Sequence, residues 1–87
     1  MTKTELIALM TKHGDACITY RSENSNKIKY NMCCIDFNNK YIKTKSNRAK
    51  ESEDTLLLWC WDTDSYRLIK PENVTSVVPL SAILKNE

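Results

Sequence analysis

Glycine and histidine are almost absent from this 87-residue chain, which has one of each, and proline occurs only twice. A glycine-rich phosphate-binding loop is excluded, because Gly14 stands alone. His13 is the one imidazole available for acid–base chemistry, and its place at the end of an apolar-periodic segment favours helix capping. No run of about 18 apolar residues occurs, so no membrane association is expected. These absences predict a protein that is not an enzyme and has no catalytic residues and no cofactor.

Four cysteines are present, but their spacing suits neither a disulfide framework nor a zinc site. Cys33 and Cys34 are adjacent, so in a strand they point to opposite faces, while Cys17 and Cys60 stand alone. Zinc sites pair ligands that are about two to four residues apart. We therefore expect reduced thiols, mostly buried, and no metal site. Because a signal-peptide core is also missing at the N-terminus, the expected location is the cytoplasm.

The elements can be placed from capping and turn residues. Thr2 and Glu5 have the spacing of a capping box, which predicts a helix over about residues 3–13 that Gly14 ends. The rest of a single domain, residues 1–87, has the β-branched and aromatic segments typical of strands over about residues 16–80. Extended segments are expected at 17–21, at 27–37, at 40–45 after a tight turn at 38–39, at 56–61, at 66–69 and, after a helical turn at Pro71, at 76–80. Pro79 places the last strand at an edge.

The segment 27–37 alternates between two kinds of side chain. One set is mostly apolar, and the other carries the charged and amide groups. The apolar set is Ile28, Tyr30, Met32 and Cys34, and the other is Lys27, Lys29, Asn31 and Cys33. Since a strand buries one face against the core, we expect the apolar set, with the Tyr30 ring, to face inward.

Leu56–Trp61 is apolar at every position, so both faces of this strand are apolar. We expect it to be the fourth strand of about five, with either Leu56, Leu58 and Cys60 or the alternate set filling the interior and the N-terminal helix covering part of the other face. Tryptophan is enriched among interface anchors. Trp59 and Trp61 are therefore the predicted partner-binding residues, and the alternative is that one of them is buried beneath the helix.

Charge is divided along the chain although the net charge is only +2. Residues 21–50 hold eight basic and two acidic side chains, whereas residues 51–72 hold six acidic and two basic ones. A basic side and an acidic side suit a protein partner at least as well as nucleic acid. Within the basic segment, Lys43, Lys45 and Arg48 are the candidates for phosphate contact.

The order of elements resembles the Sm-like and SH3-like small barrels: a leading helix, strongly bent antiparallel strands and one helical turn before the last strand. Tyr66–Ile69 followed by Val74–Val77 is similar to the closing segment of WYL-type domains, although the Trp-Tyr-Leu triad of that family is absent. The resemblance implies a mainly β, five-stranded barrel and makes Arg67 a ligand contact. The structural alternative is that Arg67 pairs with Asp62 or Asp64.

The small size and the high Asn, Lys and Cys content also resemble the small early proteins of large bacteriophages, many of which bind a host component. The leading hypothesis is accordingly a non-enzymatic binding module that occupies a host protein in the host cytoplasm or assembles with copies of itself. Two alternatives remain open. One is a nucleic-acid-binding barrel that uses the basic segment 27–50, and the other is an oligomeric sponge for a nucleotide-like ligand.

Overall fold

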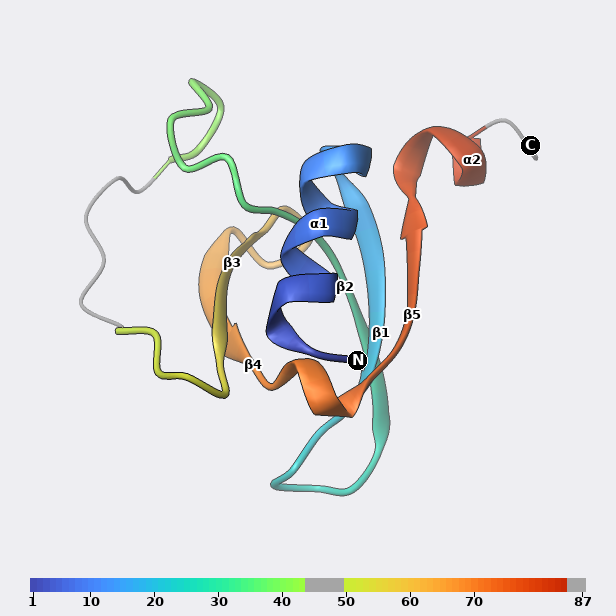
Figure 1. Cartoon of the computed structure of the whole chain (residues 1–87). Coiled ribbons are helices and arrows are strands. Elements are labelled where there is room, and N and C mark those ends of the chain that lie inside the picture. The colour runs from blue at the N-terminus through green and yellow to red at the C-terminus, as the bar shows by residue number, and fades with distance from the viewer. Residues whose placement is uncertain (44–49, 85–87) are drawn as a thin grey trace.

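The computed structural model describes residues 1–43 and 50–84, in which one helix precedes a set of strands (Figure 1). Among these residues, no helix is long and apolar enough to span a membrane. A 3₁₀ turn separates the last two strands, and a short helix follows them. The elements are α1 (Lys3–His13), β1 (Ala16–Arg21), β2 (Ile28–Cys34), β3 (Leu56–Cys60), β4 (Ser65–Ile69), η1 (Pro71–Asn73), β5 (Val74–Pro79) and α2 (Leu80–Leu84). The mainly β fold with an N-terminal helix agrees with the prediction.

Helix α1 begins and ends where its capping residues predict. The Thr2 hydroxyl accepts a hydrogen bond from the Glu5 N–H at 3.1 Å, and the Glu5 carboxylate accepts one from the Thr2 N–H at 3.1 Å. These contacts with Thr2 lower the pKa of Glu5. At the other end Gly14 has a φ of 75° and its N–H donates to the Met10 carbonyl at 2.9 Å. The helix buries Leu6 and Met10.

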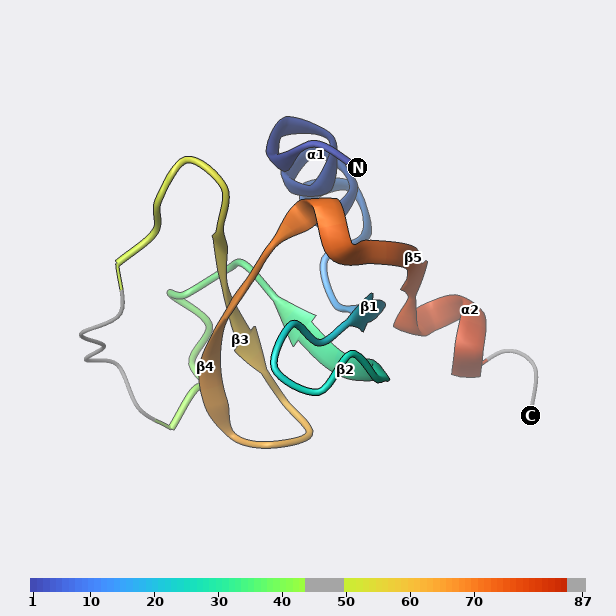
Figure 2. The ribbon, with the colours of Figure 1, turned by 90° about the horizontal axis from the view of Figure 1, so that it is seen from below.

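The five strands form one antiparallel sheet in the order β4-β3-β2-β1-β5. β5 is an edge strand, as Pro79 predicts, and the sheet is not closed by hydrogen bonds between its two edges. Figures 1 and 2 show that the sheet bends strongly, so that β4 and β5 turn toward the same side. Helix α1 lies over this concave side, next to η1 and β5.

The prediction that Ile28 and Tyr30 of β2 face inward is wrong, although Cys34 of the same set is buried. Asn31 and Cys33 are buried, whereas Ile28 is 56% exposed and Tyr30 is 64% exposed. The reason is the pairing of β2 with β1, whose buried Ala16, Ile18 and Tyr20 lie opposite the supposedly outward set. The pairs on this inner side are Ala16 with Cys33, Ile18 with Asn31 and Tyr20 with Lys29.

No strand forms in the described residues after β2 and before β3, so β3 is the third strand and not the fourth as predicted. Residues 35–43 instead turn back through side-chain contacts to their own backbone. The Asp36 carboxylate accepts from the Asn38 N–H at 3.2 Å, and the Asn39 side-chain oxygen accepts from the Tyr41 N–H at 2.9 Å. Such local bonds compete with a sheet ladder for the backbone donors.

Both faces of β3 are covered, but not by the elements expected. Leu56, Leu58 and Cys60 pack in one cluster with the buried residues of α1. Trp59 packs in a second cluster whose other buried members are Cys34 and Ile42, with Phe37, Trp61 and Tyr66 against it. The segment 35–43 therefore covers the tryptophan face, and the expectation that α1 does so is wrong.

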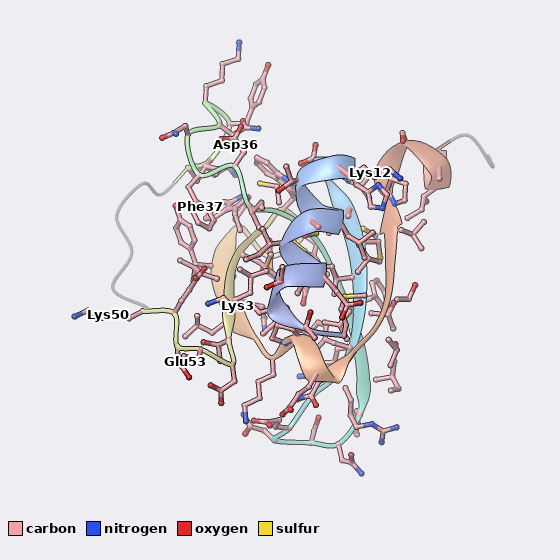
Figure 3. The ribbon with its side chains drawn as sticks, in the orientation of Figure 1. Lys3, Lys12, Asp36, Phe37, Lys50 and Glu53 are labelled. Carbon is pink, nitrogen blue, oxygen red and sulfur yellow. The ribbon has the colours of Figure 1, made fainter. Side chains whose placement is uncertain are left out.

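Residues 50–54, which lead toward β3, are all exposed. Figure 3 shows Lys50 and Glu53 extending from this segment. Lys3 on α1 reaches it, donating to the Ser52 carbonyl at 2.8 Å and pairing with Glu51 at 3.2 Å.

Candidate functional site: a basic pocket at one end of the concave face

The two predicted partner-binding tryptophans occupy different environments. Trp59 is 0% exposed and stacks edge-on against Tyr66 and Trp61, with ring centroids 4.9 and 6.0 Å away. Trp61 is half-buried, and its indole N–H donates to the Asp15 carboxylate at 2.9 Å. Burial removes Trp59 from any surface that a partner could reach, so Trp61 alone remains of the predicted pair.

The four predicted phosphate contacts are not brought together among the described residues. Lys43 pairs with Asp64 at 3.0 Å, and Lys45 and Arg48 lie outside the described residues. Arg67 is exposed and makes no ion pair with any described residue, so the expected pairing with Asp62 or Asp64 does not occur. Of the four, Arg67 is the one that lines the pocket described next.

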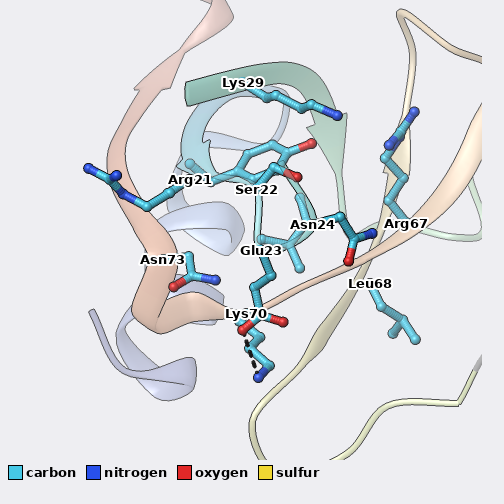
Figure 4. Close-up of a pocket in the computed structure, with 11 residues that line it drawn as sticks. Arg21, Ser22, Glu23, Asn24, Lys29, Arg67, Leu68, Lys70 and Asn73 are labelled. Atoms are coloured by element: carbon cyan, nitrogen blue, oxygen red, sulfur yellow. Dashed lines mark ion pairs between the residues drawn. The ribbon is translucent and has the colours of Figure 1, made fainter. Parts of the chain in front are cut away.

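This basic pocket has a volume of about 330 Å³ and lies between β4, the turn after β1 and the start of β2 (Figure 4). Four of its side chains are cationic and one is a carboxylate, so the lining is strongly basic. The charged members are Arg21, Lys29, Arg67, Lys70 and Glu23, and the others are Tyr20, Ser22, Asn24, Leu68, Ile69 and Asn73.

Strand alternation explains why two cations face this pocket. Lys29 lies opposite Tyr20 on β1, and Arg67 lies opposite Leu58 on β3, so both occupy the side of the sheet that elsewhere forms the core. β2 pairs with β3 only at Cys33 and Cys34. Within residues 1–43 and 50–84, no strand therefore stands between the first half of β2 and β4, and the concave face opens to solvent there.

Tyr20, which lines the pocket, is held by a hydrogen-bond network that continues away from it. The Tyr20 hydroxyl donates to the Asn31 side-chain oxygen at 2.5 Å, and the Asn31 amide donates to the Asp62 carboxylate at 3.0 Å. Asp62 also accepts from the Met32 N–H at 3.3 Å. Burial raises the pKa of Tyr20, and the nearby Arg67 opposes this shift. Tyr20 is thus a neutral donor fixed in place, since its partner is itself anchored.

The cations of the pocket differ in how far they are already paired. Lys70 and Glu23 form an ion pair at 2.8 Å, which raises the pKa of Lys70 and lowers that of Glu23. Arg21 donates to the Asn26 side chain at 3.1 Å. Lys29 and Arg67 make no ion pair or side-chain hydrogen bond with described residues, and in Figure 4 their charged ends lie on the same side of the pocket. They are the two cations free to meet an anion.

A second hollow of about 270 Å³ adjoins the basic pocket and shares Tyr20, Lys29 and Arg67 with it. Its remaining lining comes from β2, namely the exposed Ile28 and Tyr30 and the buried Asn31. The sequence analysis includes Lys29 only as part of the basic segment 27–50 and expects Tyr30 to face the core. The usable signal was Lys27-Ile28-Lys29-Tyr30, a short stretch with cations on one side and apolar groups on the other.

Catalytic groups are not gathered at this site. The one carboxylate lining the pocket, Glu23, is ion-paired, and His13 lies in the last turn of α1. The four cysteines are free thiols, and burial raises the pKa of Cys17 and, to about 11, that of Cys34. No group of metal-binding side chains occurs within residues 1–43 and 50–84. The chemistry that the pocket offers is positive charge with hydrogen-bond donors.

No protein-family model matches the chain, and neither a curated protein nor a solved structure matches it significantly. The resemblances to Sm-like, SH3-like and WYL-type domains and to bacteriophage proteins therefore remain expectations from the sequence.

Proposed function

We propose that this chain is a non-enzymatic binding module that holds a phosphate-bearing ligand in the basic pocket. One observation carries the proposal: Lys29 and Arg67 occupy inward-facing strand positions and have no described acidic partner. Both side chains are exposed to solvent, and two like charges that line one pocket repel each other less when an anion lies between them. Phosphate suits this pair, because a guanidinium and an ammonium both form strong charge-assisted bonds with its oxygens.

We further propose that the framework of this site is a small SH3-like or Sm-like barrel. The strand order, the 3₁₀ turn before β5 and the strong bend of the sheet support this assignment. In such an arrangement the open end of the concave face serves as the ligand site, because core packing is incomplete there. The basic pocket has that position.

The proposal is tested by isothermal titration calorimetry with sodium tripolyphosphate and with ATP as probes. The double variant Lys29→Gln/Arg67→Gln should bind both at least about tenfold more weakly, since a hydrogen bond to a charged group contributes about 1.5–3 kcal/mol. Lys12→Gln is the matched control, because Lys12 lines neither hollow. Equal weakening in the control, or no saturable binding by the wild type, would overturn the proposal.

A second candidate is a module that binds a host protein, and the partial exposure of Trp61 favours it. A variant that lacks the Trp61 ring but keeps the basic pocket distinguishes protein binding from phosphate binding. Trp61→Ala should reduce capture of a protein partner and leave tripolyphosphate binding unchanged. Native mass spectrometry of the protein purified from its source reports partners, copies of the chain and retained small ligands together. A retained phosphate compound supports the pocket, and a protein adduct that Trp61→Ala abolishes supports the alternative.

A further inference from the structure

The two adjoining hollows form one path, which we call the basic groove: the basic pocket together with the second hollow beside Tyr30. They share Tyr20, Lys29 and Arg67, so the free cations stand at the middle of the groove. A ligand that filled both hollows would be larger than one phosphate group. The middle of such a ligand would contact the two free cations, and its two ends would contact the remaining residues that line each hollow.

The outer end of the groove is apolar and aromatic. Tyr30 is 64% exposed and Ile28 is 56% exposed, although both lie in a strand. On one side of β2, Tyr30 pairs with Thr19 of β1. On the other side, β2 pairs with β3 only at Cys33 and Cys34. Tyr30 belongs to neither hydrophobic cluster of the described residues. Tyr30 lies on the opposite face of β2 from its neighbour Lys29, and both residues border the second hollow together with Arg67.

From this juxtaposition we propose that the basic groove binds single-stranded nucleic acid, an inference that rests on the proposed function. Lys29 and Arg67 hold backbone phosphates, and an unpaired base stacks on Tyr30. Stacking on an aromatic ring needs a base that is not paired, so a duplex is a poorer ligand. An acidic peptide would satisfy the cations, but it would gain nothing from the Tyr30 ring.

The test measures fluorescence anisotropy of labelled dT12 and rU12 with the full chain at several salt concentrations. Tyr30→Ala should weaken binding roughly fivefold to a hundredfold, the range for loss of one base–aromatic stack, whereas Tyr30→Phe should retain most affinity. Arg67→Gln should lower the salt slope by about 0.7, the value for one lost phosphate contact on a single strand. Lys12→Gln is the control for loss of charge alone.

The outcomes separate this inference from the proposed function. If tripolyphosphate and ATP bind through Lys29 and Arg67 but dT12 and rU12 bind no more tightly than ATP, the pocket takes free nucleotides and the strand-binding inference is wrong. The inference is also wrong if Tyr30→Ala matches wild type, or if polyglutamate competes as well as dT12 at equal charge. Loss of all phosphate binding removes both proposals. Thermal unfolding of each variant excludes misfolding as the cause.

Discussion

Two aromatic regions of this small protein contrast in a way that its sequence does not suggest. The tryptophan cluster around β3 contains the most apolar stretch of the chain and is packed inside, with Trp59 fully buried. The start of β2 was expected to face the core, yet Tyr30 lies in solvent beside Lys29 and Arg67. Apolar content alone therefore does not decide whether a strand residue is buried. The decisive factor is whether another segment covers it.

The coverage differs because the two regions have different neighbours. β3 lies between β2 and β4, and its tryptophan face is covered by Ile42 and Phe37 from the irregular segment 35–43. The first half of β2 has β1 on one side and no strand on the other. The first region therefore contributes stability, and the second leaves cations and a ring available for a ligand.

Replacing Trp59 should have the largest effect on stability. Trp59→Ala leaves a cavity in the second cluster and should cost about 3–5 kcal/mol in the free energy of unfolding, measured in urea. Tyr30→Ala is the matched aromatic control and should stay within about 0.5 kcal/mol, because the ring is exposed. If Trp59→Ala and Tyr30→Ala lower the free energy of unfolding equally, the proposed contrast between the two regions is wrong.

Trp59→Phe sharpens the same comparison. Among the described residues the Trp59 indole N–H has no hydrogen-bond partner. Phenylalanine keeps much of the ring volume and removes this unpaired donor, so Trp59→Phe should cost clearly less than Trp59→Ala. An equal loss would mean that the indole shape itself is required.

Segment 35–43 provides the second test, because it is the cover that the contrast depends on. Ile42 is buried, and Ile42→Ala should cost about 2 kcal/mol, near the lower end of the range for such truncations, because an irregular segment can partly collapse into the space. The neighbouring Tyr41 is exposed, and Tyr41→Ala should change the unfolding midpoint little. If the two variants behave alike, the segment does not seal the tryptophan cluster.

The smallest expected effect is alkaline destabilisation through the thiol in the same cluster. Burial raises the pKa of Cys34 to about 11, above the value of about 8.5 for a free thiol. Between these values the unfolded chain loses a proton that the folded chain keeps, so stability is complete below about pH 8 and falls as the pH rises toward 11. Cys34→Ala should lessen the decline in thermal midpoint between pH 8 and pH 10. If the thermal midpoint of Cys34→Ala falls as steeply with pH as that of the wild type, other titrating groups cause the decline.

Much of the local structure could be predicted because its causes are local. The bounds of α1 follow from Thr2 and Glu5 at one end and Gly14 at the other, and the turn before β5 follows from Pro71. The edge position of β5 agrees with Pro79. Of the candidate site, Arg67 was the one residue predicted individually, through a resemblance. Lys29 was predicted only as part of the basic segment 27–50, and Tyr30 was predicted to face the core, because alternation alone does not show which face of a strand is buried.

The sequence by itself determined the helix, most of the strands and the apolar character of both faces of Leu56–Trp61. Only the tertiary structure decided which face of β2 is buried and where the free cations meet. The physical reason is that a buried polar residue such as Asn31 is tolerated when distant groups satisfy it, here Tyr20 on β1 and Asp62 beyond β3. Those partners come close only after the sheet has folded. Which face of β2 is buried, and with it the basic groove, therefore depends on long-range contacts.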